Sequence, residues 1–180
     1  MRGFTIIELV VAMAILVSFL ALGIPKMHSM VERHNSQTVF YSLRRTLAQA
    51  RGLAQDKLIN ICVCPLQGSS CSSNWDKPVS VFNDQNANNT LDDGEEIFFN
   101  TDVSTTYGFW QKSKASQNYV RFNPLGHAFS SATTFLYCPY SNRDINAKSI
   151  VISFQGRIRT APYLNRNGQP YAHFSSLNCD

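Results

Sequence analysis

The sequence opens with GFTIIELVVAMAILVSFLALGI, residues 3–24, and this apolar stretch decides how the rest of the chain is organised. Glu8 is its only ionisable side chain. A helix rises about 1.5 Å per residue, so the stretch is long enough to cross a hydrocarbon core roughly 30 Å thick. A cleavable signal peptide has a shorter apolar region, about 7–15 residues, followed by a small-residue cleavage site that Ile24-Pro25-Lys26 does not provide. We therefore predict a transmembrane helix over residues 4–25.

The single carboxylate in this stretch indicates its use. A charge inside a membrane helix costs a few kcal/mol and is usually retained for function. A short leader that ends in Gly3, followed by Phe4, Glu8 and an unbroken apolar helix, resembles the prepilin signal of type IV pilins and type II secretion pseudopilins. The resemblance implies a leader of residues 1–3, cleaved between Gly3 and Phe4 by prepilin peptidase, which then methylates Phe4. It also implies that Glu8 meets the Phe4 amine of a neighbouring subunit during assembly.

The location follows from the charge flanking the span. Arg2 precedes the apolar stretch, and the positive-inside tendency then predicts a single-pass protein of the inner membrane with a periplasmic C-terminal domain. The family resemblance implies later transfer into a pilus or pseudopilus. It implies as partners other pilins or pseudopilins, the prepilin peptidase and an inner-membrane assembly platform.

Helical periodicity continues beyond Pro25 and predicts one long helix that ends near Lys57. Its apolar stripe at three- and four-residue spacing comprises Val39, Leu43, Leu47, Ala50, Ala54 and Leu58. We interpret the arginines beside this stripe, Arg44, Arg45 and Arg51, as a solvated face. Residues 26–58 are then the periplasmic half of the helix, and residues 59–180 a β-rich globular domain.

Short alternating segments in that domain predict strands. They cover residues 59–64, 79–82, 97–99, 119–122, 133–138, 149–154 and 157–160, with Pro65 ending the first. One long helix followed by short strands predicts an α+β fold with an antiparallel sheet. The pilin-like resemblance implies the same arrangement, a long N-terminal helix whose second half packs on the sheet.

Five cysteines lie beyond the membrane helix, where an oxidising compartment would pair them. The loop after Cys64 is similar to the cysteine-containing first loop of some GspH/FimT-type sequences, and we expect the pairs Cys64–Cys71 and Cys138–Cys179. Cys62 is then either free and buried or exchanged into one of these pairs. Zinc binding by Cys62, Cys64 and Cys71 is the alternative, although the spacing is not typical of structural zinc.

An acidic segment lies between the strands at residues 79–82 and 97–99. Compared with the twelve-residue calcium loop, it places oxygen-bearing residues at all six ligand positions: Asp84, Asn86, Asn88, Thr90 (through its carbonyl), Asp92 and Glu95. The flanks, however, are predicted strands, and a loop rich in Asn, Asp and Gly is also typical of a plain hairpin turn. We expect a hairpin without calcium and keep Ca²⁺ as the alternative; no other cofactor is expected.

The last predicted hairpin carries two arginines. Residues 149–154 and 157–160 form its strands, Gln155-Gly156 its two-residue turn, and Arg157 and Arg159 share one face about 6–7 Å apart. Paired guanidinium groups can bind neighbouring phosphates. The segment from Gly156 to Arg159, with the upstream Phe122-Asn123-Pro124-Leu125-Gly126, resembles the C-terminal half of GspH/FimT-family minor pilins, including FimT proteins that bind DNA. Double-stranded DNA is therefore a candidate partner, and a subunit contact or solubility is the alternative role for these arginines.

The sequence thus favours a structural subunit over an enzyme. His28 and His34 belong to the long helix near the membrane, His127 and His173 have no flanking nucleophile or acidic motif, and we assign no catalytic residue. The expected function is that of a minor pilin that helps to assemble or prime a type IV pilus. A GspH-type pseudopilin of a type II secretion system is the first alternative, and a DNA-binding module for DNA uptake is the second.

Overall fold

The structure, a computed structural model, describes residues 5–104, 106–113, 117–128, 131–140, 147–162, 177 and 179; the side chains of residues 19–26, 28 and 29 are not described. One helix, α1 (Ile6–Lys57), is followed by strands β1 to β9. The contacts divide the chain into two compact units, Met1–Asn35 and Ser36–Asp180. The helix end at Lys57 confirms the prediction.

The first unit contains the start of α1. Thr5 and Glu8 form a capping box there: the Glu8 Oε2 atom accepts from the Thr5 backbone N–H and hydroxyl, both at 3.2 Å. Within the described part of the chain, no helix is both long enough and apolar enough to span a membrane. Phe4 and the side chains of residues 19–26, which belong to the predicted span, are not described, so the span remains a prediction.

In the second unit, α1 buries the predicted stripe. Val39, Leu43, Leu47, Ala50 and Ala54 are each at most 5% exposed. Leu58 is an exception to the prediction, because the helix has ended before it. It adopts a left-handed backbone angle of φ 54° and is 72% exposed. The buried stripe therefore ends at Ala54, one helical turn before Leu58, although the helix itself ends where it was predicted to end.

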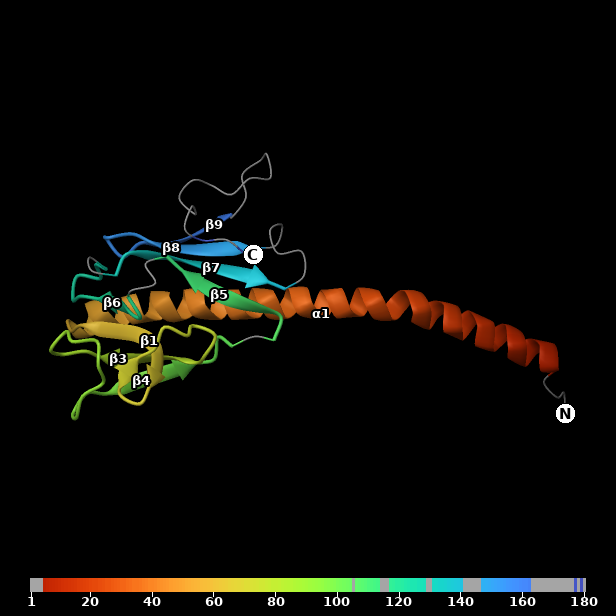
Figure 1. Ribbon diagram of the computed structural model, residues 1–180, viewed down its shortest axis with the longest axis horizontal. Coiled ribbons are helices and arrows are strands. Elements are labelled where there is room, and N and C mark those ends of the chain that lie inside the picture. The colour runs from red at the N-terminus through yellow and green to blue at the C-terminus, as the bar shows by residue number, and fades with distance from the viewer. Residues whose placement is uncertain are drawn as a thin grey trace. The chain divides into compact units, whose positions relative to one another are not determined.

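The first sheet has five strands. Figure 1 shows three of them, β1, β3 and β4, on one side of the second half of α1. The antiparallel order of the sheet is β2-β1-β3-β4, with β6 also paired to β1. The bounds are β1 Ile61–Gln67, β2 Ser70–Cys71, β3 Val79–Asn83, β4 Ile97–Thr101 and β6 Val120–Phe122. The prediction that Pro65 ends the first strand is wrong: β1 continues to Gln67, and the Pro65 carbonyl accepts the Ser72 N–H at 2.7 Å. Proline has no backbone N–H, but β1 uses only the carbonyl of Pro65 in this hydrogen bond, so the strand is not interrupted.

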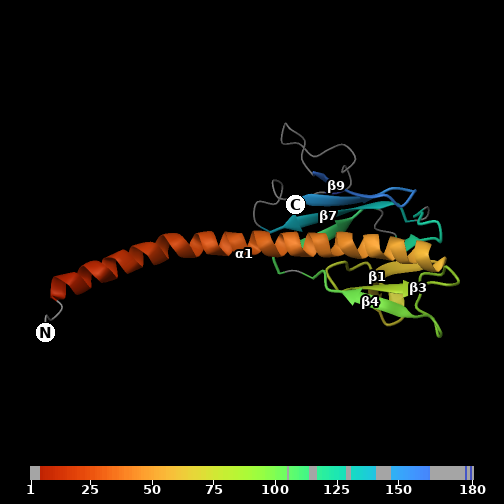
Figure 2. The same cartoon turned by 180° about the vertical axis from the view of Figure 1, so that it is seen from behind.

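The second sheet has four antiparallel strands in the order β5-β7-β8-β9. They are β5 Gly108–Lys112, β7 Thr133–Pro139, β8 Lys148–Ile152 and β9 Ile158–Pro162. Figure 2 shows this sheet and the first one from behind, with the second half of α1 running between them. The α+β class and the helix-on-sheet arrangement are confirmed, but the strands form two sheets where the sequence predicted one.

The main core joins α1 to both sheets. It contains Phe40, Leu43 and Leu47 from the helix, Ile61 and Val63 from β1, and Phe135 and Ile150 from the second sheet. Cys62 and Cys64, on the other face of β1, pack in a separate cluster with Phe82. The predicted alternation of β1, with apolar residues on one face and cysteines on the other, is thus confirmed, and it leaves the sulfur atoms outside the main core.

Candidate functional site

The arginine hairpin ends in a longer turn than predicted. Gly156 N–H donates to the Ser153 carbonyl at 2.8 Å, and Ser153 N–H donates to the Arg157 carbonyl at 3.1 Å. Gly156 has φ +72°. This is a four-residue turn with a left-handed glycine at its last position, a common hairpin connection. The predicted two-residue turn at Gln155-Gly156 is wrong because the last two residues of the first predicted strand, Ser153 and Phe154, are part of the turn.

Gly156 packs directly against a second turn. A Cβ atom built on Gly156 would lie 1.8 Å from the Gly126 carbonyl oxygen, so the position has no room for any side chain. The second turn is closed by Asn123, whose carbonyl accepts Gly126 N–H at 2.7 Å and whose Oδ1 accepts His127 N–H at 2.8 Å. The segments before Gly126 and around Gly156, which the sequence comparison singled out separately, are therefore in contact.

Arg51 joins both turns to α1. Its Nε donates to the Gly126 carbonyl at 3.0 Å, and a terminal guanidinium nitrogen donates to the Gln155 carbonyl at 3.4 Å. Gln55, one helical turn later, donates to the Leu125 carbonyl at 3.4 Å. The interpretation of Arg51 as part of a solvated face is wrong: the side chain is half-buried and fixes the arginine hairpin, whereas Arg44 and Arg45 are exposed. No local sequence pattern indicated this role, because the carbonyl partners lie 75 and 104 positions away.

The two hairpin arginines present their charge to solvent. Arg157 and Arg159 are exposed, and Ile158 between them is half-buried against the core. Among the described residues β9 is an edge strand, paired only to β8. Lys148, at the far end of β8, has its Nζ 5.9 Å from the ring centres of both Phe40 and Tyr41. Arg166, which could extend this basic surface, lies outside the described residues.

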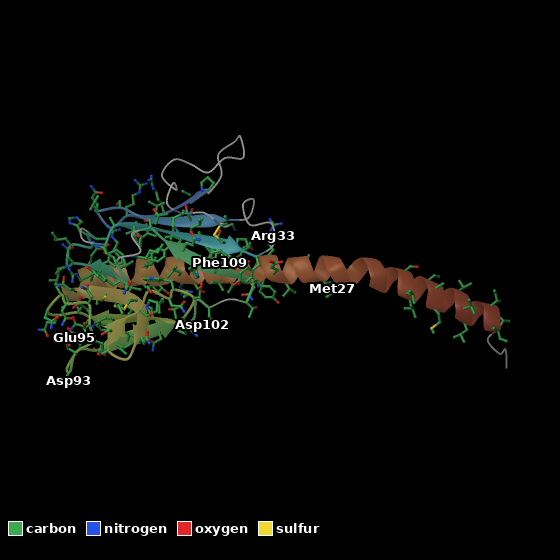
Figure 3. The ribbon with its side chains drawn as sticks, viewed as in Figure 1. Met27, Arg33, Asp93, Glu95, Asp102 and Phe109 are labelled. Atoms are coloured by element: carbon green, nitrogen blue, oxygen red, sulfur yellow. A yellow bond between two sulfur atoms is a disulfide. The ribbon has the colours of Figure 1, made fainter. Side chains whose placement is uncertain are left out.

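The acidic loop is closed by its own hydrogen bonds. Glu95 accepts Gln85 N–H at 2.7 Å and Asp92 N–H at 3.0 Å. Asp92 Oδ2 accepts the side-chain amides of Asn86 and Asn88, both at 2.7 Å. Figure 3 shows Asp93 and Glu95 together at the end of the domain where α1 ends. Five of the six predicted calcium ligands thus belong to one compact loop, with Thr90 donating its N–H to Asn88 Oδ1 at 2.8 Å.

The sixth predicted calcium ligand, Asp84, is fully buried and lies beside the guanidinium group of Arg121. Arg121 lies 3.4 Å from Asp84 Oδ2, and the same guanidinium nitrogen donates to Asn89 Oδ1 at 2.9 Å and to the Ala87 carbonyl. Asp84 Oδ1 accepts Asn88 N–H at 2.9 Å. A guanidinium group in this position would repel a divalent ion. Sequence reasoning missed this role of Arg121. The alternation of β6 places Arg121 on the face opposite to the buried Val120 and Phe122, which the sequence shows. Its position beside the acidic loop follows only from the strand pairing Cys62↔Arg121.

Both predicted disulfides are confirmed. Cys64–Cys71 and Cys138–Cys179 have Cα–Cα distances of 5.5 and 5.4 Å. Cys62 is free and buried. Burial raises the pKa of the Cys62 thiol far above its ordinary value, Asp84 raises it further, and Arg121 lowers it. The three sulfur atoms of Cys62, Cys64 and Cys71 lie within 4.8 Å of one another, but two of them are joined in a disulfide, which leaves no thiolate set for zinc.

The processing residues Gly3 and Phe4 lie outside the described residues.

A small cavity of about 90 Å³ lies elsewhere, between the two tryptophans of the domain; its lining is Ser73, Trp75, Trp110, Lys112, Gln117 and Asn118. The Trp75 Nε1 atom is buried and has no hydrogen-bond partner among the described residues.

The sequence model of one protein family, described as "Type II transport protein GspH", matches residues 42–156. The chain belongs to the GspH family. The match runs from the second half of α1 to the glycine that seats the arginine hairpin, and so includes the acidic loop and the turn at Gly126. GspH/FimT/FimU-like proteins are pilin-type structural subunits, which agrees with the predicted resemblance.

The solved structures support the same fold. Two crystal structures of the type IV minor pilin FimU from Pseudomonas aeruginosa match with TM-scores of 0.57 and 0.54. Their sequence identities are 21% and 22%; the matches cover 74% and 70% of this chain and 92% of the FimU chain in each case. No curated protein sequence matches the chain significantly. This chain and FimU therefore share the pilin-like fold.

Proposed function

We propose that this GspH-family protein is a minor pilin of a type IV pilus. The combination that supports the proposal is Glu8 at the start of a 52-residue helix whose second half is packed against a disulfide-linked β domain. The inner membrane would hold the precursor, and prepilin peptidase would cleave it between Gly3 and Phe4. The mature subunit would then join other pilins through an inner-membrane assembly platform.

Glu8 has a specific task in this proposal. The Thr5 N–H and hydroxyl now satisfy its carboxylate. Cleavage creates a charged amine at Phe4, and a carboxylate in an apolar filament core would be stabilised by that amine of a neighbouring subunit. Mass spectrometry of the mature protein should find an N-terminus at methylated Phe4. Glu8→Ala should still be cleaved but should be lost from purified filaments; incorporation at the wild-type level would contradict the assignment.

The alternative is a GspH-type pseudopilin of a type II secretion system, in keeping with the description of the matching family. The two roles use one fold and one processing route, so only the cellular consequence separates them. A deletion strain should be scored together for twitching, natural transformation and protein secretion. Loss of twitching with intact secretion is expected; the opposite pattern would assign the chain to secretion.

Sequence-independent contact with double-stranded DNA is the second candidate function. The exposure of Arg157 and Arg159 on a hairpin fixed by Gly156 and Arg51 favours it. Two exposed guanidinium groups two positions apart in the chain can bind adjacent phosphates. A gel shift with the full chain in detergent micelles should lose most of its retained DNA in the double variant Arg157→Gln, Arg159→Gln. Equal retention would remove these arginines from the account.

We also propose that the acidic loop works without calcium. The Arg121 guanidinium supplies the positive charge that Asp84 needs, and the Asp92 and Glu95 carboxylates accept hydrogen bonds from amide groups of the loop. Calorimetric titration of the protein with CaCl₂ should give no binding heat, and Asp84→Ala should behave in the same way. A saturable heat that Asp84→Ala abolishes would instead establish a calcium site.

A further inference from the structure

Three sulfur atoms gather on the outer face of β1, and only two of them are bonded. The free Sγ of Cys62 lies 4.0 Å from the Sγ of Cys71, which is already joined to Cys64. Cys62 and Cys64 are two residues apart on one strand and therefore project from the same face. Cys71 thus has two sulfur neighbours in a shared, largely apolar cluster, lined by Leu66, Phe82, Leu91 and Tyr119.

This arrangement is unlike that of an isolated buried cysteine. A buried thiol with no reactive neighbour is inert, whereas a thiol beside a disulfide has an electrophilic sulfur within reach. The two sulfurs must approach from 4.0 Å to about 2 Å to bond, which side-chain rotation and a small movement of the short strand β2 can supply. The cluster therefore holds every atom that an exchange reaction needs.

We propose that Cys62 is the nucleophile of an intramolecular thiol–disulfide exchange that converts the Cys64–Cys71 disulfide into Cys62–Cys71. Cys62 releases its proton to solvent and its sulfur bonds to Cys71 Sγ. The bond between Cys71 and Cys64 breaks, and its electron pair leaves on Cys64 Sγ, which takes up a proton. One disulfide and one thiol are present before and after, so no external oxidant or reductant is required.

The exchange has a structural consequence because β2 is bonded to the acidic loop. The Ser69 carbonyl accepts Leu91 N–H at 2.8 Å, and Ser70 forms a bridge with Thr90. The covalent anchor of Cys71 then moves by two residues along β1, and the accompanying movement of β2 disturbs its bonds to that loop. The two disulfide isomers therefore differ in the loop at residues 84–95 as well as at the sulfur atoms.

The reaction is gated by local opening. The Cys62 thiol is buried beside the Asp84 and Glu95 carboxylates, which disfavour the thiolate, and Arg121, which favours it. Uncatalysed disulfide rearrangement takes minutes to hours even in accessible sites. We expect hours here, with one isomer dominant at equilibrium and the other detectable.

A labelling time course tests the exchange in the full chain in detergent micelles. The protein is incubated at pH 8.5, quenched in acid, unfolded, alkylated and mapped by tandem mass spectrometry. Label should begin on Cys62 and appear on Cys64 over hours, and a Cys62→Ser variant should gain no label on Cys64. Label that stays on Cys62 throughout, including in a mild concentration of urea that opens the loop, would overturn the proposal, as would label on Cys64 in the Cys62→Ser variant.

A trapped isomer gives the second test. Cys64→Ser should contain a Cys62–Cys71 disulfide and no alkylatable thiol, and hydrogen exchange of the peptide covering residues 84–96 should differ from the wild type. The control Cys62→Ser retains Cys64–Cys71 and should show the wild-type exchange pattern. Two free thiols at Cys62 and Cys71 in Cys64→Ser, with the circular dichroism of the folded protein, would overturn the proposal.

Discussion

Single residues decide how the two candidate sites are held. Gly156 allows the arginine hairpin to contact the turn at Gly126, and Arg121 neutralises the buried Asp84 carboxylate inside the acidic loop. Neither residue needs to touch a ligand to matter for function. Their effects are measurable as free energies of unfolding.

Gly156→Ala should destabilise the protein by about 2–5 kcal/mol. The left-handed angle costs a non-glycine residue about 1–2 kcal/mol, and the overlap with the Gly126 carbonyl adds about 1–3 kcal/mol. Gly68→Ala is the matched control, because Gly68 has φ +65° but open space around its Cβ position, so that it isolates the backbone cost. Urea unfolding measures both; equal losses would mean that the close contact carries no energy.

Arg121→Met should cost about 3–5 kcal/mol, because it leaves the buried Asp84 carboxylate without its counter-charge. The double variant Arg121→Met, Asp84→Asn should recover part of that loss, since no charge is then left buried. A double-mutant cycle by urea unfolding measures the coupling. Additive effects of the two substitutions would show that the ion pair does not stabilise the loop.

Asp76 predicts a pH dependence. Burial raises the pKa of this carboxyl group above 3.8. The backbone N–H of Trp110, which donates to Asp76 Oδ1 at 2.8 Å, opposes the rise in pKa. The unfolded chain therefore loses this proton first, and folding stability falls as pH rises through about 3.8 and stays lower above the folded pKa. Asp76→Asn keeps an acceptor for Trp110, so it should be more stable than the wild type at pH 7 but not at pH 3. The measurement is the difference in unfolding free energy between Asp76→Asn and the wild type at each pH. An equal difference at pH 3 and pH 7 would contradict the prediction.

At the scale of elements, the two disulfides close loops of very different length. Cys64–Cys71 joins residues 7 apart in β1 and β2, whereas Cys138–Cys179 joins residues 41 apart and ties Cys179, near the end of the sequence, to β7. Chain entropy therefore makes the second bond the more stabilising. It also makes the first hairpin the place where rearrangement costs least.

Replacing both Cys138 and Cys179 by serine should lower the free energy of unfolding by about 4 kcal/mol, and replacing both Cys64 and Cys71 by about 2.5 kcal/mol. The smaller value for the first pair follows from its shorter loop. Denaturant unfolding under non-reducing conditions measures both variants. A larger loss for the Cys64/Cys71 pair would show that packing of the sulfur cluster, and not loop closure, dominates there.

At the scale of the whole molecule, the proposed contact with DNA depends on where the surface charges lie. The hairpin arginines lie on β9 and in the turn before it, while Arg44 and Arg45 are exposed on α1. If DNA binds through the hairpin, removing its two charges should matter more than removing two others.

The salt dependence of DNA binding tests this. The slope of log K against log salt should fall by about 2 in magnitude for Arg157→Gln, Arg159→Gln, since each neutralised phosphate contributes about 0.9. The charge-matched control Arg44→Gln, Arg45→Gln should leave the slope nearly unchanged. Fluorescence anisotropy with labelled duplex DNA between about 50 and 200 mM salt measures it. Equal changes in both variants would indicate a general charge effect.

The sequence by itself determined the helix and its end at Lys57, the α+β class, the family resemblance and the Cys64–Cys71 disulfide, because local period, the prepilin motif and the first cysteine-containing loop are written in neighbouring residues. The Cys138–Cys179 disulfide, between residues 41 apart, was also predicted, although no local pattern encodes it. The sequence did not determine the split into two sheets, the four-residue turn before Arg157, or the roles of Arg51 and Arg121. Those depend on partners far away in the chain, the Gly126 carbonyl 75 residues from Arg51 and Asp84 37 residues from Arg121. Only tertiary packing, which sets strand register and brings separate turns into contact, could decide them.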